Sequence, residues 1–521
     1  MAIFGAFAPT GSRPVRWYNY AAYGSNDILG AGSMAVISGW VLFFYTTFCG
    51  LEAWQAGLIF TVARVLDAIA SPVIGHISDN MGQTALGRRF GRRRFFILAA
   101  IPLLPSFAIM WVSGQSFWYY LATYVLFELV YAMEIIPYET LAAEMGKDYR
   151  TKAKFAGIRI LFAQASAILA GYLPAMLIES LGKESADTFL YMGILFSALF
   201  VVTAALLFLF SWERPLAEVA ALKSGEAKPS LGAAFGALYH NLFSTFRIRA
   251  FRLHLGMYLG GYISQDVFNA AFTFFVVFAL AGSITVASTL LGTMYIVQFV
   301  AVMIAINLAL KTSPAFAYRL AAASFAIGVI TLLAMWGAGV RSGDLLLWVP
   351  IALAGLGRGA LNYIPWATYN YMADVDEIVT GRRREGAFAG VMTFVRKLTQ
   401  AVAVAGVGAL MSLGGFQKDA AVQPPEAITT IALVLGIGTV GMLIFGVLVS
   451  LRFRLDPRTH AVLMEEIDRF KNTPNAPASA EARAIVEDLS GWPHEQLWGR
   501  NPVAKAGAAR ETSAQGGMAQ A

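Results

Sequence analysis

A series of twelve apolar runs constrains the fold of this chain more than any other feature. Each run is roughly 20 residues long, which is enough for a helix to cross a hydrocarbon layer of about 30 Å. Hydrophobic residues make up 57% of the chain and charged residues 14%, with a mean hydropathy of +0.60. The sequence therefore predicts an all-α, multi-pass membrane protein. The runs lie at about 26–47, 54–77, 95–113, 117–140, 155–179, 188–211, 253–280, 285–310, 316–337, 345–373, 387–413 and 427–451.

A polar segment separates the runs into two sets of six. The expected parts are an N-terminal six-helix bundle (1–211), a cytoplasmic linker (212–252), a C-terminal six-helix bundle (253–454) and a cytoplasmic tail (455–521). The tail segment "DPRTHAVLMEEIDRFK" predicts an amphipathic helix, and the last ~20 residues have the composition of a disordered segment. Similar corners at Ala143-Glu144 and Ala373-Asp374, each ending the fourth span of its set, indicate a duplication.

Basic residues mark one side of the membrane. They accumulate in the loops after even-numbered spans, above all in "GRRFGRRR", whereas the other loops hold Lys183, Arg341 and Lys418. Because Lys and Arg resist translocation, the basic loops and both termini are predicted to be cytoplasmic, in a cell (inner) membrane. The net charge of +7 is then explained by anionic lipid, with no nucleic-acid partner required.

Five segments carry a family resemblance. They are "YGSNDILG", "VARVLDAIASPVIGHISD", "GRRFGRRR", "IPYETLAAEMGKDY" and "ADVDEIVTGRRREGAFAGVMTFVRK". Together they resemble the glycoside, pentoside and hexuronide cation symporters, a branch of the major facilitator superfamily that includes melibiose permease. The resemblance covers roughly residues 17–451. It implies two pseudo-symmetric six-helix bundles and transport by alternating access.

The second span carries charges within its apolar run. Arg64, Asp67 and Ser71 are spaced i, i+3 and i+7, so they share one helix face. A charge at mid-span costs about 2.5 to 3.5 kcal/mol, and such residues generally line a cavity or ion path, or form a pair. Asp67 is therefore a candidate for binding a cation or a proton, and a purely structural pair with Arg64 is the alternative.

The resemblance places Asp67 in the family's coupling-cation site. The family has a second acidic residue where this chain has Ser71, and an asparagine where it has Ala70. With fewer oxygen ligands than Na⁺ prefers, the site is expected to couple transport to H⁺, with Na⁺ less favoured. Thr393 and Lys397 match positions near that site, and Lys397 is expected to neutralise Asp67 between cycles unless it snorkels or pairs elsewhere.

Substrate-binding candidates also follow from the resemblance. Arg159 and Trp366 stand where the family has a sugar-contacting arginine and a stacking tryptophan, groups suited to sugar hydroxyls and to the apolar face of the ring. The galactose-binding aspartates are replaced by Ala31 and Ile135, so a melibiose-like galactoside is not expected. Further polar candidates within the spans are Asn26, Asp27, Glu128, Glu134, Glu139, Gln265, Asp266 and Asn269. Arg396 is expected to be structural or to face the cytoplasm.

A cytoplasmic gate is a further hypothesis. Charged hydrogen bonds near the cytoplasmic ends of spans two and eleven would lock the two halves together and break on inward opening. The same residues are also topology determinants, which is the alternative. The candidates are Gly75, Asp79, Arg92, Arg383 and Glu385.

These features predict a secondary active transporter, a proton-coupled symporter that imports a glycoside or other sugar. The sequence contains no phosphate-binding loop, nucleophile elbow or cluster of metal ligands, so no enzyme activity, cofactor or metal is expected. The expected partners are a sugar, a coupling cation and membrane lipid. Two alternatives remain: the same fold carrying a lysolipid or exporting drugs, and a non-transporting membrane sensor.

Overall fold

The protein is built almost entirely of helices. The computed structural model describes residues 10–11, 13–146, 149–182, 184–215, 232, 236, 244–369, 371–381, 384–473 and 477–500. Within these residues the one departure from helix, turn and coil is an isolated β-bridge between Thr10 and Glu213. Eleven helices of the described chain are long and apolar enough to cross a membrane. The all-α membrane fold predicted from the apolar runs is confirmed.

The first set of spans opens with an interrupted helix. Two π-helical turns divide it into α2 (Trp17–Ser25), η1 (Ile28–Gly32), α3 (Ser33–Val36), η2 (Ile37–Val41) and α4 (Leu42–Thr47). The other long helices of this set are α5 (Ala53–Asn80), α9 (Phe117–Met145), α10 (Tyr149–Leu181) and α11 (Ala186–Phe210). A short turn, η3 (Met81–Gln83), and the helix α6 (Ala85–Phe90) follow α5.

The third apolar run does not form one continuous helix. It is divided into α7 (Arg94–Ala100), η4 (Ile101–Leu103) and α8 (Ser106–Ile109). Pro102 and Pro105 explain the division, because proline lacks an N–H donor and its ring clashes with the preceding turn. The run predicted at 95–113 is therefore the one that falls short of a full-length helix among the described residues.

The second set of spans repeats the pattern. Its helices are α14 (Arg249–Phe274) with η5 (Phe275–Ala279), α15 (Ile284–Lys311), α16 (Pro314–Gly337), η6 (Leu345–Leu347) with α17 (Trp348–Tyr369), α18 (Met372–Thr380), α19 (Glu385–Leu413), and α20 (Pro425–Leu433) with η7 (Val434–Gly438) and α21 (Thr439–Ser450). The predicted domain boundaries stay a prediction, since much of the linker 212–252 lies outside the described residues.

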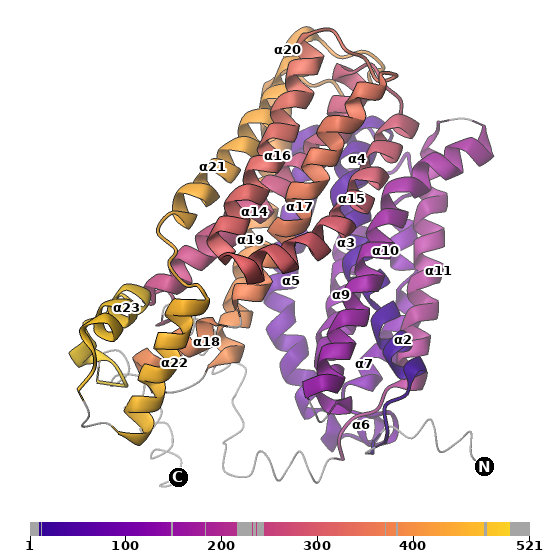
Figure 1. The fold of residues 1–521 in the computed structure, drawn as a ribbon. Coiled ribbons are helices and arrows are strands. Elements are labelled where there is room, and N and C mark those ends of the chain that lie inside the picture. Colours follow the sequence, from indigo (N-terminus) through magenta and orange to yellow (C-terminus); the bar gives the residue numbers. More distant parts are fainter. Residues whose placement is uncertain are drawn as a thin grey trace.

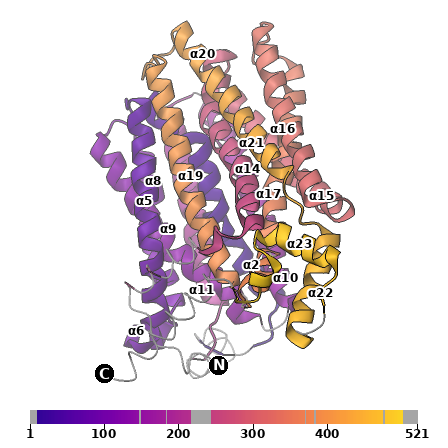
Figure 2. The ribbon, with the colours of Figure 1, turned by 90° about the vertical axis from the view of Figure 1, so that its left-hand side faces the viewer.

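The two sets lie side by side as two halves (Figures 1 and 2). They meet along two seams, α5 against α19 and α10 against α15. Figure 1 shows α20 at one end of the molecule, whereas α6, α18 and α22 lie at the opposite end, and these ends are called the α20 end and the α6 end below. The assignment of the α6 end to the cytoplasm remains a prediction from the basic loops.

Polar contacts tie the halves together at the α20 end. The backbone N–H of Trp54 donates to Ser412 Oγ (3.0 Å), and Lys418 Nζ lies 3.4 Å from Glu52 Oε1. The first contact joins α5 directly to α19. The seam between these helices is therefore fastened where α5 begins and α19 ends.

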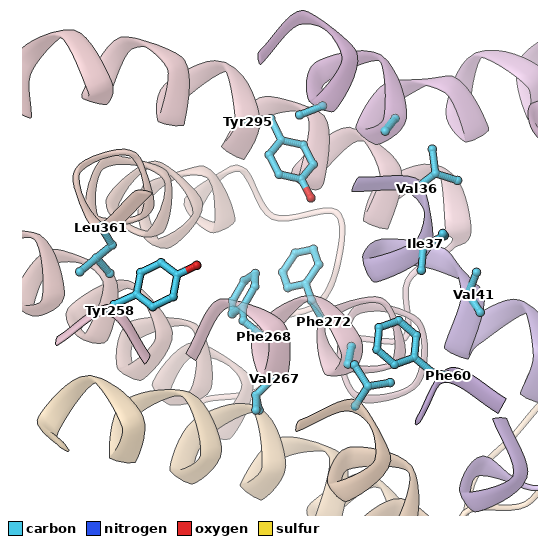
Figure 3. Packing of buried hydrophobic residues seen from close by; sticks show 14 of the residues in the cluster. Val36, Ile37, Val41, Phe60, Tyr258, Val267, Phe268, Phe272, Tyr295 and Leu361 are labelled. Atoms are coloured by element: carbon cyan, nitrogen blue, oxygen red, sulfur yellow. The ribbon is translucent and has the colours of Figure 1, made fainter. Parts of the chain in front are cut away.

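Buried apolar side chains from both halves also pack together. Val36 and Ile37 of the first span, Phe60 of α5 and Phe272 of α14 belong to one core cluster (Figure 3). Lipid offers no hydrophobic driving force between helices, so such packing stabilises the assembly through close contact.

The tail forms a small helical unit that docks on the second half. It consists of α22 (Pro457–Asn472), as predicted from its sequence, with α23 (Ala480–Ser490) and η8 (His494–Gln496), which were not predicted. His460 Nε2 lies 2.8 Å from Asp374 Oδ2, and the backbone N–H of Trp498 donates to the Ile378 carbonyl (2.7 Å). Both partners belong to α18. The disorder predicted for the chain end concerns residues 501–521, which lie outside the described residues.

Candidate functional site

Asp67 lies halfway along α5 and is fully buried. Lys397 Nζ, from α19 of the other half, is 2.7 Å from Asp67 Oδ2. Ser71 Oγ donates to Asp67 Oδ1 (3.0 Å) and accepts a hydrogen bond from Lys397 Nζ (2.9 Å). The carboxylate, the hydroxyl and the ammonium thus form one polar contact across the α5–α19 seam.

Arg64 extends this group on the side of the first half. Its Nη1 lies 3.3 Å from Glu128 Oε2 and 3.9 Å from Asp67 Oδ2, and its guanidinium carbon lies 5.2 Å from the centre of the Phe60 ring. Two cations and two carboxylates are therefore balanced when all four are ionised. Because an unpaired buried charge is expensive, this balance explains how the spans tolerate them.

Thr393, the remaining coupling candidate, lies one helical turn before Lys397 and is exposed in this structure. It shares the helix face of Lys397 but lies closer to the α6 end. The structure thus brings together Arg64, Asp67, Ser71 and Lys397, and leaves Thr393 outside this contact.

A second polar cluster connects the first span with α9 and α10. Arg159 Nε donates to Asp27 Oδ1 (2.9 Å), and its Nη2 donates to Glu139 Oε1 (3.2 Å). Asn26 Nδ2 donates to Glu134 Oε1 (2.7 Å). Asn26, Asp27 and Glu134 are buried, whereas the Glu139 side chain is 54% exposed and that of Arg159 33% exposed. The cluster therefore runs from the interior to an accessible surface.

Local backbone features place Asp27 in this cluster. A Cβ at Gly30 would lie 2.6 Å from Asp27 Oδ1, so a larger residue there would displace the carboxylate. A Cβ at Gly24 would lie 2.9 Å from Ile158 Cγ2, next to Arg159 on α10. The π-helical turn η1 begins directly after Asp27, and such turns are frequent at functional sites.

The second half contributes a third cluster. Arg396 Nη1 and Nη2 donate to Asp266 Oδ2 (2.6 Å) and Oδ1 (2.7 Å), a bidentate pair. The Arg396 guanidinium lies 4.9 Å from the centre of the Tyr262 ring, and Trp366 Nε1 donates to Tyr262 Oη (2.9 Å). Two of the substrate candidates, Asp266 and Trp366, are thus linked through Tyr262 and Arg396.

Of the two alternatives expected for Arg396, a structural role or a place facing the cytoplasm, the structure fits the first, because the side chain pairs with the buried carboxylate of Asp266 within the second half. Sequence reasoning missed Arg358, a buried residue halfway along α17. The sequence did hold a signal for Arg358: it is a cation inside an apolar run, as Arg64 is.

Gln265, another candidate, is buried and donates to the Gly261 carbonyl of its own helix (3.1 Å).

Two arginines at the α6 end, the gate candidate Arg92 and Arg384, have carboxylate partners within their own halves. Arg92 Nη2 lies 2.5 Å from Glu144 Oε1, and the Arg92 backbone N–H donates to Glu213 Oε2 (3.0 Å). In the other half, Arg384 makes a bidentate contact with Asp376. These pairs brace the ends of the helices on either side of the seam.

Of the remaining gate candidates, the structure describes Gly75 in full. Arg383 and the side chains of Asp79 and Glu385 lie outside the described residues. A Cβ at Gly75 would meet Ile136 of its own half at 3.8 Å, so Gly75 is not tightly packed against α19 here. The gating role stays a prediction.

The described residues contain no group of three or more His, Cys, Asp or Glu side chains placed to hold a metal ion. The clusters above consist of carboxylates paired with Arg or Lys and of amides, hydroxyls and aromatic rings. Such groups bind and release protons and hydrogen-bond to polar solutes.

Comparison with known proteins identifies relatives along most of the chain. Residues 22–457 match the family model described as MFS/sugar transport protein. A protein of Escherichia coli (strain K12) named glucuronide carrier protein homolog is 24% identical, over 88% of this chain and 97% of its own length. An uncharacterized symporter of Synechocystis is 23% identical, over 86% and 95%. An uncharacterized symporter of Bacillus subtilis is 33% identical over 187 residues, which is 33% of this chain and 38% of that protein.

Solved structures share the fold. A D-xylose–proton symporter superimposes with a TM-score of 0.58 at 15% identity, covering 84% of this chain and 96% of that one. A bacterial homologue of the lysosomal transporter Spinster, in an inward-facing and occupied conformation, gives a TM-score of 0.56 at 17% identity, with 86% and 100% covered. At these identities the likeness shows the fold alone, which is the predicted major facilitator fold.

Proposed function

The chain belongs to the MFS/sugar transport protein family, and from this premise we propose that it is a symporter that uses a proton gradient to import a sugar across the inner membrane. It is a secondary active transporter and not an enzyme, and it takes a small-molecule substrate and a coupling cation. The proton as that cation, the direction of transport and the residues involved are our proposals.

The observation that carries the proposal is the contact of Asp67 with Lys397 across the seam. Na⁺ is a poor fit, because the Lys397 ammonium occupies one side of the carboxylate and would repel a second cation. A proton added to Asp67 removes its charge and with it the attraction for Lys397. Loading with H⁺ therefore weakens a contact between α5 and α19, which is the step that alternating access requires.

The other two clusters provide groups for a sugar. Arg159, Asp27 and Glu139 offer donors and acceptors for hydroxyl groups from the first half. Trp366, half-exposed on the second half, offers an aromatic face. The printed name of the E. coli relative, a glucuronide carrier homologue, supports a sugar as cargo. An amphiphile carrier, a drug exporter or a sensor has less support, because the named relatives are symporters and carriers.

The arrangement of the seams favours an inward-open state for this structure. Contacts such as Trp54 with Ser412 close the α20 end, and Gly75 near the α6 end is not tightly packed against the other half. With the predicted topology, the accessible part of the Arg159 cluster would then face the cytoplasm.

The test is uptake into proteoliposomes with a panel of labelled mono- and disaccharides, under an imposed pH gradient or an imposed Na⁺ gradient. We expect accumulation driven by an acidic exterior, and loss of accumulation in Asp67→Asn. Asp187→Asn, which removes an exposed carboxylate at the start of α11, is the matched control and should behave as the unaltered protein. Accumulation that follows Na⁺ at constant pH, or survives Asp67→Asn, would contradict the proposal.

A further inference from the structure

Arg358 is a buried cation without an acidic partner. It lies halfway along α17 and is 3% exposed. Its Nε donates to Gln298 Oε1 (3.2 Å) and its Nη1 donates to Asn269 Oδ1 (2.9 Å), both neutral amides. Among the described residues no carboxylate lies within 4 Å of it, and its Nη2 makes no hydrogen bond.

The other mid-span cations of the described chain all have carboxylate partners. Arg396 occupies both oxygens of Asp266, which lies one helical turn from Asn269 on α14. Asp266, on the same helix as Asn269, is therefore already engaged. The remaining pairs are Arg64 with Asp67 and Glu128, Lys397 with Asp67, and Arg159 with Asp27 and Glu139.

Aromatic rings hold the Arg358 guanidinium in place without neutralising it. Its central carbon lies 5.6 Å from the centre of the Phe268 ring, 5.8 Å from that of Tyr295 and 5.7 Å from that of Phe325. Figure 3 shows Phe268 and Tyr295 within the buried cluster, on α14 and α15. The rings and the two amides orient a full positive charge, and leave it uncompensated where water is scarce.

The amide partners of Arg358 place it beside the first half. Asn269 Nδ2 donates to Ser38 Oγ of the first span (3.4 Å), and Gln298 Nε2 donates to Gln164 Oε1 of α10 (3.4 Å). Arg358 therefore lies between the two halves, where a solute carried by alternating access binds. Trp366 lies on the same helix, two turns toward the α6 end.

We propose that Arg358 binds a negatively charged group of the substrate, so that the cargo is an acidic sugar bearing a carboxylate or sulfonate. This inference rests on the proposed sugar transport and specifies the substrate class of that site. A guanidinium pairs with two oxygens of such a group in one plane, and the pair is strong where bulk water is excluded. The substrate then supplies the counter-charge that the protein lacks.

The test is binding to the purified protein, measured by calorimetry, with four ligands of the same ring: methyl glucoside, methyl glucuronide, the methyl ester of that glucuronide, and the 6-sulfonate analogue. We expect the wild-type protein to bind at least one acid more than tenfold more tightly than the ester and the glucoside. The two acids distinguish carboxylate from sulfonate. The ester differs from the glucuronide by one methyl group, which removes the charge.

Variants assign that preference to one residue. Arg358→Gln should reduce the acid-to-ester preference to about one, and Arg358→Lys should keep part of it, because charge remains but the planar fork is lost. Arg319→Gln, at the start of α16 where the side chain contacts the Ala315 carbonyl, is the matched control and should keep the full preference.

The outcomes separate this inference from the proposed function. If the wild-type protein binds the ester as tightly as the acids, or if Arg358→Gln keeps the preference, the inference is overturned while sugar transport stands. The wild-type comparison holds even if a variant fails to fold. If no sugar, acidic or neutral, is bound or taken up under a pH gradient, the proposed function fails and the inference fails with it.

Discussion

At the scale of single residues, the interior of this protein depends on pairing. Asp67 touches Lys397, Arg64 touches Glu128, and Asp266 takes both hydrogen bonds from Arg396. Lone mid-span charges are costly, and each pair removes most of that cost. A pair whose partners belong to different helices also fixes how those helices sit against each other.

The Asp266–Arg396 pair gives a prediction at this scale. Asp266→Asn leaves a buried cation without its partner and should destabilise the protein by about 3 to 5 kcal/mol. The double variant Asp266→Asn with Arg396→Gln should recover part of the loss, because no net charge remains. Thermal unfolding in detergent measures both. A double variant less stable than the single one would show that the pair does not act as a unit.

At the scale of helices, small residues set how closely the two halves approach. A Cβ at Gly408 of α19 would lie 2.3 Å from the Ala53 carbonyl oxygen at the start of α5. A Cβ at Gly406, two residues earlier, would meet nothing within 4 Å. Close backbone approach of this kind is what small residues permit in membrane helices.

The two glycines form a matched pair for a test. Gly408→Ala should push α5 and α19 apart and lower stability by about 1 to 3 kcal/mol, as overpacking does. Gly406→Ala should be neutral or slightly stabilising, because alanine is the better helix former. The measurement is the melting temperature of each variant in detergent. If Gly408→Ala and Gly406→Ala changed the melting temperature equally, a tight seam at Gly408 would be contradicted.

The tail helices offer a pH-dependent prediction at the same scale. Burial raises the pKa of Glu466, but the hydrogen bonds from Arg469 and His494 outweigh it and hold that pKa below its ordinary value. A lowered pKa in the folded state contributes stability above the unfolded pKa of about 4.3, which is lost as the pH falls through the folded value.

We therefore expect the contact of α22 with η8 to persist at neutral pH and to loosen below about pH 4. Limited proteolysis of the tail across this range measures the loosening. Glu466→Gln should loosen the tail already at neutral pH, whereas Glu465→Gln, at the exposed neighbouring position on α22, should not. A tail that stays equally protected in Glu466→Gln would contradict the assigned role.

At the scale of the whole molecule, the two halves must separate at the α20 end during transport. The contact of the Trp54 N–H with Ser412 Oγ lies in that closed region. Cysteines at both positions, in a Cys49→Ser background that removes the one native cysteine, should form a disulfide on oxidation and stop uptake. Reduction should restore it. Either cysteine alone should leave uptake unaffected, and full uptake by the cross-linked protein would exclude opening at this point.

The sequence by itself determined the apolar runs, eleven of which form helices long enough to cross a membrane in the described chain, and the charged positions inside them. These features depend on local composition, because a run of apolar residues is stable in lipid wherever its neighbours lie. The break at Pro102 and Pro105, which the runs did not reveal, also has a local cause.

The tertiary structure alone decided which charges meet. Sequence spacing joined Arg64 to Asp67 on one helix, but Glu128, on another, completes that group. It gave no means of seeing that Arg396 pairs with Asp266, or that Arg358 hydrogen-bonds to two amides and lies close to three aromatic rings. Such pairings depend on how helices far apart in the chain pack and rotate against each other, and the pattern along any one helix does not contain that information.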